Sequence, residues 1–171
     1  KGILFWRIFT HWIGGMGVLV FILAILPKSE GRGIHIMKAE SPGPSVDKLV
    51  SKVKITAIIL YSIYIALTLL EIIILLILKM PLYDSIVHSL ATAGTGGFSI
   101  YNDSIAHYNS LGIEITLSIF MIVFGINFTL YYLILIGKFR QAIKSEELRW
   151  YLGIVIVSIT LITLNTYINN V

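Results

Sequence analysis

The sequence contains no cysteine, and charged residues occupy only 13% of its 171 positions. The absence of cysteine excludes disulfide bonds and thiolate metal sites, and it leaves the redox compartment undefined. So little charge, together with 57% hydrophobic residues and a mean hydropathy of +0.89, is outside the range of soluble domains. The sequence therefore predicts an integral membrane protein.

Clusters of residues that carry chemistry are also missing. The four histidines fall in separate segments without the spacing of metal ligands: His11, His35, His88 and His107. No nucleophile lies beside a base in the pattern that an enzyme needs. We therefore expect no metal cluster and no enzymatic activity.

An initiator methionine is absent as well. The chain opens on Lys1 and Gly2 against a hydrophobic run and closes just beyond another one. We expect an internal fragment of a longer protein, so no signal peptide can be read from it.

The sequence does contain long apolar runs. A full crossing of the bilayer takes about 20 mainly apolar residues. Four stretches qualify, at residues 5–26, 55–79, 113–136 and 149–168. We expect each of them to be a transmembrane helix.

The basic residues give these spans an orientation. Ten Lys and Arg lie in two loops, 28–54 and 137–149, whereas only three lie on the other side. Short loops rich in Lys and Arg stay in the cytoplasm, so both chain ends and residues 80–112 are predicted to be outside. The net charge of +4 follows from this topology, and we do not expect nucleic-acid binding.

Residues 80–112 contain an apolar stretch too short to cross the membrane. Pro81 can open a helix there, because the first position of a helix needs no N–H. A helix over residues 82–93 would be roughly 18 Å long, about half a bilayer. The sequence AGTGGFS follows at residues 93–99. We predict a helix that enters from outside and a glycine-rich return to the same side, which is tolerated at membrane depth only where protein or water satisfies the backbone.

The glycines of this return suggest ion binding. Gly94, Gly96 and Gly97 can adopt backbone angles closed to other residues, so successive carbonyls can face a common axis. Such carbonyls replace the hydration shell of a monovalent cation, and the C-terminal end of the preceding helix adds a partial negative charge. Thr95 could contribute a hydroxyl or brace the loop. An ordinary extracellular turn is the alternative, and a phosphate-binding loop is a third, although no Lys-Ser or Lys-Thr pair follows the glycines.

Four motifs occur in a specific order along the chain. They are FWRIFTHWIGGMGVLVFILAILP, MKAESPGPSVDKL, ATAGTGGFS and FGINFTLYY, the last followed by a basic loop. Together they cover nearly the whole sequence. In this respect the chain resembles the Trk/Ktr/HKT superfamily of potassium transporters, and the TrkH type most closely.

The resemblance implies an all-α integral membrane protein of the potassium-channel-like type. In that family one polypeptide carries four repeats of span, re-entrant pore helix, filter loop and span around a single pore. The chain would then divide into five segments: 1–27, the second span of repeat one; 28–54, a cytoplasmic loop; 55–137, repeat two, with its pore helix at about 82–93 and its filter at about 94–98; 138–148, a cytoplasmic loop; and 149–171, the first span of repeat three.

By the same resemblance, Gly96 falls at the signature glycine of the filter, with Gly94, Thr95 and Gly97 supplying neighbouring carbonyls. The register between Gly96 and Gly97 stays open because they are adjacent. The transported ion would be K⁺, held by filter carbonyls only, with Na⁺ also possible because family members differ. We expect Gly96 to be the position most sensitive for transport, since its carbonyl would face the ion in a conformation that a β-carbon disfavours.

The resemblance also implies partners. These are the lipid bilayer of the cell membrane, a second full-length chain in a homodimer, and a cytoplasmic ring of nucleotide-binding regulatory subunits. The nucleotide site would belong to the ring, so this chain is expected to hold no cofactor. The implied function is potassium uptake across the plasma membrane, driven by the membrane potential.

A few residues inside the predicted spans are further candidates. A charge at Glu71 costs a few kcal/mol or more unless it is paired, protonated or hydrated, so this residue is a candidate for the pore or for a structural hydrogen bond. Asn127 can bond across helices at about 1 kcal/mol or line the pore. Gly14, Gly15 and Gly17 predict close helix packing rather than a second filter.

Two other functions fit parts of the sequence. A membrane-embedded enzyme could use Glu71, Asn127 and Thr95, but it would need a nucleophile and base or a metal cluster. A helical scaffold for other membrane proteins would leave the glycine-rich segment unexplained. Potassium uptake therefore explains most of the sequence.

Overall fold

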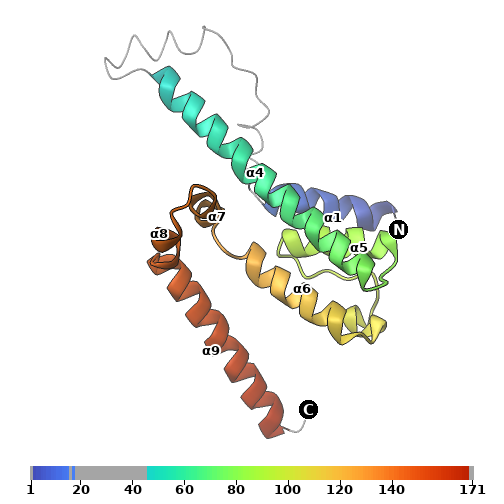
Figure 1. The fold of residues 1–171 in the computed structure, drawn as a ribbon. Helices are drawn as coiled ribbons and strands as arrows, with labels where there is room; N and C mark the ends of the chain where they lie inside the picture. The colour runs from blue at the N-terminus through green and yellow to red at the C-terminus, as the bar shows by residue number, and fades with distance from the viewer. Residues whose placement is uncertain (1, 16, 18–45, 170–171) are drawn as a thin grey trace. The chain divides into compact units, whose positions relative to one another are not determined.

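The computed structural model describes residues 2–15, 17 and 46–169 (Figure 1). Every regular element in these residues is a helix, so the prediction of an all-α membrane protein is confirmed. The chain forms two compact units, Lys1–Gly125 and Ile126–Val171. The first contains α1 (Gly2–Gly15), α4 (Val46–Ile77), α5 (Leu82–Ala93), the 3₁₀ helix η1 (Ser104–Tyr108) and α6 (Leu111–Phe124). The second contains α7 (Phe128–Leu135), α8 (Phe139–Ile143) and α9 (Glu146–Asn169).

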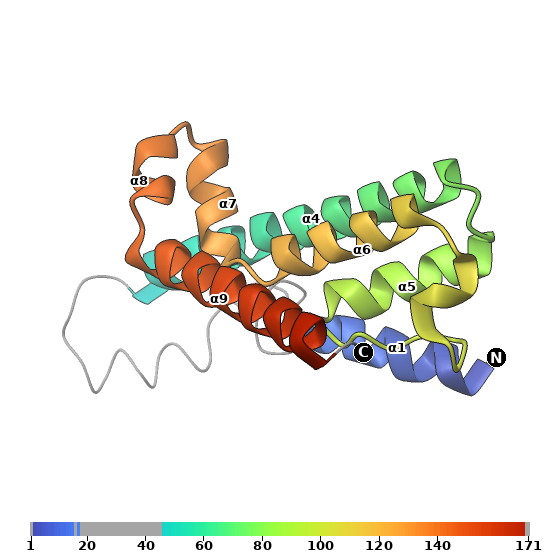
Figure 2. The same cartoon turned by 90° about the horizontal axis from the view of Figure 1, so that it is seen from below.

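The short helix α5 is the centre of the first unit. It lies between α1 and α6 and also packs along α4 (Figures 1 and 2). Most of its residues from Asp84 to Ala93 are buried, although it is only 12 residues long. Several of the buried side chains are small: Ser85, Ser89, Ala91 and Ala93. Small residues let helix backbones approach closely, which is how helices associate where lipid removes the hydrophobic drive.

Two apolar clusters hold α5 and its neighbours together. In the first, Ile8 of α1 packs against Val87 and Leu90 of α5. In the second, Leu75 of α4 packs against Leu117 of α6, together with Met80 and Ile113. The first cluster therefore fixes α5 against α1, and the second joins α4 to α6.

The inner face of α4 carries polar side chains at helical spacing. Its buried residues recur every three or four positions: Ala57, Tyr61, Tyr64, Thr68, Glu71 and Leu75. One side of an α-helix has this period, so these side chains form a single stripe. Large apolar residues such as Leu69 and Ile73 are exposed outside the stripe. A helix with this pattern fits lipid on one side and protein on the other.

The helices correspond to the predicted spans with two differences in extent. Ile55–Ile77 of α4 and Glu146–Ile168 of α9 are long and apolar enough to cross a membrane. However, α4 begins at Val46, inside the loop predicted at 28–54, and α8 occupies part of the loop predicted at 137–149. In the first predicted span only α1 and Gly17 are described, and the remainder of residues 5–26 lies outside the described residues.

The span predicted over 113–136 is not one continuous helix. Gly125 ends α6, and Asn127 begins α7 as its N-cap, with its side-chain oxygen accepting a hydrogen bond from the Thr129 N–H at 2.9 Å. An asparagine cap satisfies one of the four free N–H groups at a helix start, and so stabilises the break. The two helices give a third crossing only if they act as one broken span.

In the second unit, α9 exposes apolar side chains all around its axis. Ile154, Ile162 and Leu161 are each more than half exposed, and none of the most apolar stretch is buried within the described residues. A helix that is hydrophobic on every side is stable in a membrane or between other helices, not in water.

Candidate functional site

The end of α5 forms a Schellman motif at the start of the glycine-rich segment. The N–H of Gly96 donates to the Ala91 carbonyl at 2.8 Å, and the N–H of Thr95 donates to the Thr92 carbonyl at 2.8 Å. These are the two bonds that define the motif, with Gly94 as C-cap and Thr95 as the residue beyond it. The segment 94–97 is thus attached to a buried helix through its N–H groups.

Thr95 occupies the left-handed position of this motif, where glycine is usual. Its φ is +56°, and for a β-branched residue a positive φ is a genuine outlier. Holding a non-glycine residue there costs about 1–3 kcal/mol. The same motif ends α4, where Lys79 takes the left-handed position with φ +66°, and α7, where Gly137 takes it with φ +80°. A non-glycine residue in this position therefore does not by itself mark the 94–97 segment as functional.

The conformational reason predicted for Gly96 is wrong. The positive φ values in the segment belong to Thr95 and Gly97, the latter with φ +64°, and Gly96 is not among the positive-φ residues. A β-carbon on Gly96 meets a different obstacle, because it would lie 2.6 Å from Nε2 of His11. Gly96 is therefore required by close contact with α1 rather than by its backbone angles.

The carbonyl groups of the segment take no part in the Schellman motif. Those of Gly94, Thr95, Gly96 and Gly97 accept no backbone hydrogen bond within the described residues. An unpaired carbonyl is costly at membrane depth unless water or a ligand meets it. Thr95 and Gly97 are exposed, whereas the helix before them is buried. The geometry therefore offers several carbonyl oxygens at the negative end of a short buried helix.

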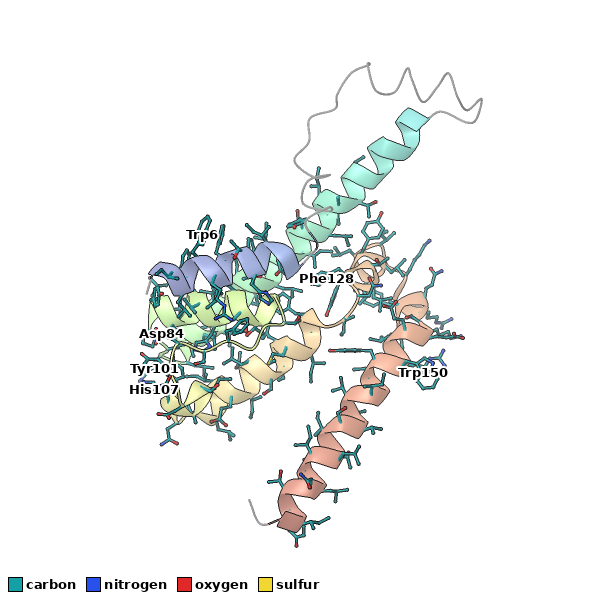
Figure 3. The ribbon with its side chains drawn as sticks, turned by 180° about the vertical axis from the view of Figure 1, so that it is seen from behind. Trp6, Asp84, Tyr101, His107, Phe128 and Trp150 are labelled. Carbon is teal, nitrogen blue, oxygen red and sulfur yellow. The ribbon has the colours of Figure 1, made fainter. Side chains whose placement is uncertain are left out.

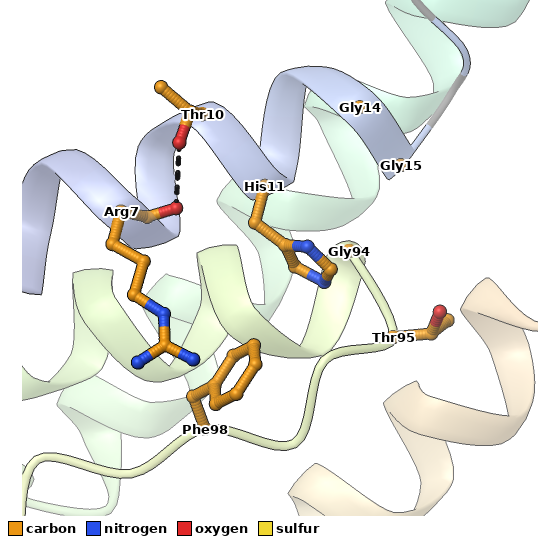
Figure 4. Close-up of a pocket in the computed structure, with 8 residues that line it drawn as sticks. All are labelled: Arg7, Thr10, His11, Gly14, Gly15, Gly94, Thr95 and Phe98. Atoms are coloured by element: carbon orange, nitrogen blue, oxygen red, sulfur yellow. Dashed lines mark hydrogen bonds between the residues drawn. The ribbon is translucent and has the colours of Figure 1, made fainter.

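A cavity of about 690 Å³ lies between α1 and this segment (Figure 4). Its lining consists of Arg7, Thr10, His11, Gly14 and Gly15 from α1, and Gly94, Thr95 and Phe98 from the segment. The Arg7 guanidinium carbon lies 4.3 Å from the centre of the Phe98 ring, within cation–π range. The positive charge of Arg7 is thus held against an aromatic face beside the segment.

The predicted close packing of the α1 glycines holds at one of them. A β-carbon on Gly15 would lie 3.0 Å from Cα of Gly94 and 2.6 Å from the Tyr64 hydroxyl, so no larger residue fits. Gly14 and Gly17 have nothing within 4 Å of such a β-carbon among the described residues. The end of α1 therefore lies directly against the end of α5.

Two aromatic residues of α4 and α1 hold this approach in place. The Tyr64 hydroxyl donates to the Trp12 carbonyl at 2.8 Å, and the two rings stack with centroids 5.4 Å apart. The Trp12 indole N–H donates to the Thr68 hydroxyl at 3.3 Å. These contacts join α1 to the polar stripe of α4 one residue after His11.

At the other end of α5, a buried acid anchors the chain that returns from the segment. The Asp84 carboxylate is 6% exposed and accepts hydrogen bonds from the hydroxyls of Tyr108, at 2.8 Å, and Tyr101, at 3.3 Å. The Tyr101 ring stacks on the His107 ring, with centroids 3.7 Å apart. The side chains of Asp84, Tyr101 and His107 lie near one end of the helix (Figure 3). Asp84 also lies in the first turn of α5, where a negative charge is favourable.

The two tyrosines remain hydrogen-bond donors over the physiological range. Burial first, and then the hydrogen bond to Asp84, raises the pKa of Tyr108 above its ordinary value. The charge of Asp84 likewise raises the pKa of Tyr101. Both hydroxyls therefore stay protonated, and able to donate, at neutral pH.

Glu71 belongs to the buried stripe of α4, and its side chain is completely buried. Neither carboxyl oxygen has a hydrogen-bond partner among the described residues, and the Thr92 side chain of α5 lies close enough to interact with the carboxyl group. Thr92 in turn accepts the Thr95 N–H through its backbone. Glu71 thus contacts the helix turn that carries the segment, and its direct contact with an ion stays a prediction.

Asn127 forms contacts within the second unit. Besides capping α7, its side-chain amide donates to both carboxylate oxygens of Glu147, each at 3.1 Å. Glu147 lies in the first turn of α9, so the bond joins two helices. A role of Asn127 in lining a pore stays a prediction.

Among the described residues, the histidines do not form a metal-binding cluster. No group of three or more metal-binding side chains occurs in the part of the chain that the structure describes. His88 is buried in α5 and meets the Tyr108 ring edge-on at 5.8 Å. His35 lies outside the described residues.

Comparison with known proteins identifies the family. The family model described as "Cation transport protein", TrkH, matches residues 1–166. The chain belongs to the TrkH family. It is therefore a member of a transporter family rather than an enzyme family, and its apolar helices agree with a membrane location.

Several curated and solved TrkH-type proteins are similar to this chain. The Trk system potassium uptake protein TrkH of Salmonella typhimurium is 33% identical over 171 residues, which is 99% of this chain and 35% of that protein. TrkG of Escherichia coli K12 is 33% identical over 164 residues, covering 92% of this chain and 34% of that protein. The crystal structure of the potassium transporter TrkH from Vibrio parahaemolyticus matches with a TM-score of 0.55 at 32% identity, covering 76% of this chain and 25% of that one. The chain thus spans about a third of the length of these curated relatives.

Proposed function

We propose that the full-length protein takes up K⁺ across the cell membrane through a passage in which Gly94, Thr95, Gly96 and Gly97 supply one set of carbonyl ligands. The observation that carries this proposal is the end of α5. Its Schellman motif uses the N–H groups of Thr95 and Gly96, while the carbonyls of 94–97 have no backbone partner within the described residues. Relatives named as potassium uptake proteins support K⁺ as the ion.

The physics of the segment favours a monovalent cation. Carbonyl oxygens are neutral dipoles, so they can replace the hydration shell of K⁺ without holding it too tightly to leave. The C-terminal end of α5 contributes about half a negative charge behind the segment. Inward movement is driven by the membrane potential, which contributes about 2.3 kcal/mol per charge for each 100 mV.

Uptake by the full-length protein tests this function. It would be expressed in cells that lack their own potassium uptake systems, and radioactive rubidium would be used as the tracer. We expect rubidium uptake well above the vector control, inhibited more strongly by K⁺ than by Na⁺ and abolished by a protonophore that collapses the membrane potential. Uptake at the vector level, with the protein present in the membrane, would contradict the proposal.

The proposal includes an orientation, with residues 28–54 in the cytoplasm and 80–112 outside. Because the sequence has no cysteine, single cysteines can report it. We expect an impermeant thiol reagent added to intact cells to label a cysteine at Asn102 and to leave one at Ser45 unlabelled until the cells are permeabilised. The reverse labelling pattern would overturn the orientation.

The partners implied by the family resemblance are also part of the proposal. We propose that two full-length chains form a homodimer and that a cytoplasmic ring of nucleotide-binding subunits binds to it. Both contacts would use surfaces other than the site described above. We propose that such a ring would meet the basic loops at 28–54 and 137–149, since their charge predicts a cytoplasmic location.

A further inference from the structure

The imidazole of His11 lies directly over two glycines of the 94–97 segment. A β-carbon on Gly94 would be 2.5 Å from Cδ2 of His11, and one on Gly96 would be 2.6 Å from Nε2. Real β-carbons essentially never approach other atoms so closely. Figure 4 shows the ring pointing from α1 toward the turn at Gly94. One side chain therefore contacts the backbone at both positions.

The ring is itself held in place on several sides. Phe98 meets it edge-on, with ring centroids 5.6 Å apart. On the backbone side, Tyr64 bonds the carbonyl of Trp12, the next residue of α1. The close approach of Gly15 to Gly94 prevents α1 from moving inward. Nε2 of His11 is buried and has no hydrogen-bond partner among the described residues, so no polar contact there explains its position.

From these contacts we propose that His11 is a positioning residue for the ion-binding segment, and that the volume of its ring sets the path of the backbone from Gly94 to Gly96. This inference rests on the proposed function of the segment. It assigns to α1, the helix before the loop at 28–54, a share in cation discrimination. A smaller side chain at position 11 would let the backbone shift toward α1 and change the spacing of the carbonyls, on which selectivity depends.

The test is a double-substitution experiment in the full-length protein, read as the ratio of rubidium to sodium uptake at equal amounts of protein in the membrane. Gly96→Ala alone is expected to lower the ratio by about tenfold, because the new β-carbon would lie 2.6 Å from Nε2 of His11 and the backbone must shift away from the ring. His11→Ala alone is expected to lower it by about threefold. In the His11→Ala background, Gly96→Ala is expected to change the ratio by less than about threefold, since the His11 ring no longer meets the new methyl group and only the Phe98 ring, whose Cδ2 would lie 2.9 Å from it, still has to shift.

Gly97→Ala is the matched control. A β-carbon on Gly97 meets only Cε of Met121, at 4.0 Å, and does not contact His11. Its effect is therefore expected to be equal in both backgrounds. A variant that fails to fold would be recognised by a lower amount of protein in the membrane. In such a variant a second substitution at Gly96 would not restore selectivity.

The outcomes distinguish the positioning role of His11 from the proposed function of the segment. An equal effect of Gly96→Ala with and without His11 would overturn the positioning role while leaving the proposed function intact. A wild-type protein without preference for rubidium, or a Gly97→Ala protein with an unchanged ratio, would instead count against the filter itself. If His11→Ala does not reach the membrane, His11→Asn, whose side chain is shorter than the imidazole, decides the same question.

Discussion

Gly97→Ala in the full-length protein is expected to reduce K⁺ over Na⁺ discrimination by about tenfold while leaving its amount in the membrane unchanged. Gly97 has φ +64°, which costs an alanine about 1–2 kcal/mol. The new β-carbon has room, since its nearest neighbour is 4.0 Å away. The strain is therefore relieved by rotating the peptide groups on either side, and this turns the carbonyls of Gly96 and Gly97. A change of about 1.4 kcal/mol in K⁺ binding is tenfold.

The control for this prediction is Gly137→Ala. Gly137 has φ +80° and nothing within 4 Å of an added β-carbon among the described residues, so the same strain arises outside the 94–97 segment. Competition of K⁺ and Na⁺ against rubidium uptake measures the discrimination of each variant. A Gly97→Ala protein with the wild-type ratio, or a Gly137→Ala protein with the same loss, would show that the segment is an ordinary turn.

Local patterns in the sequence were sufficient to locate α5. Pro81 stands just before it as the N-cap, and Gly94 is its C-cap, so both ends carried a signal that a single sequence reveals. The apolar runs were sufficient to locate α4 and α9, since a stretch of about 20 apolar residues has few alternatives to a membrane helix. These features depend on neighbours in the chain.

The break between α6 and α7 also had a local signal that the apolar run concealed. Gly125 and Asn127 stand two residues apart, in the order of a helix end followed by a helix cap. An average of hydropathy does not detect these two residues, because the flanking residues are apolar. Treating the cap signals as equal to hydropathy would have predicted two helices.

The contacts around the segment could not have been predicted in the same way. His11 and Gly96 are far apart in the sequence, and only the packing of α1 against α5 brings them together. In the sequence His11 is only one of four separated histidines, and no local pattern distinguishes Asp84. The left-handed residue is Thr95 rather than Gly96, because the Schellman motif fixes it by position and not by residue type. The two adjacent glycines, Gly96 and Gly97, gave no means of choosing the register of the filter.

Asp84→Ala is expected to destabilise the full-length protein by about 3 kcal/mol, because it removes two hydrogen bonds to a charged group and leaves the half-buried Tyr108 hydroxyl without its acceptor. The thermal unfolding midpoint in detergent measures this loss. Asp84→Asn retains one acceptor oxygen and should lose about half as much. Asp103→Asn is the matched control, since this acid is exposed and its side chain makes no capping bond.

A double-mutant cycle identifies the bond responsible. Tyr108→Phe removes the shorter of the two hydrogen bonds without opening a cavity, so the Asp84→Asn and Tyr108→Phe losses should not add, and their coupling should be about 1 kcal/mol or more. The pair is also the link between the start of α5 and the chain that returns from residues 94–97. Loosening this link should weaken rubidium over sodium discrimination in Tyr108→Phe, whereas Asp103→Asn should keep it. Additive losses, or a Tyr108→Phe protein as stable as the wild type, would mean that the return segment is held by its aromatic stacking and not by Asp84.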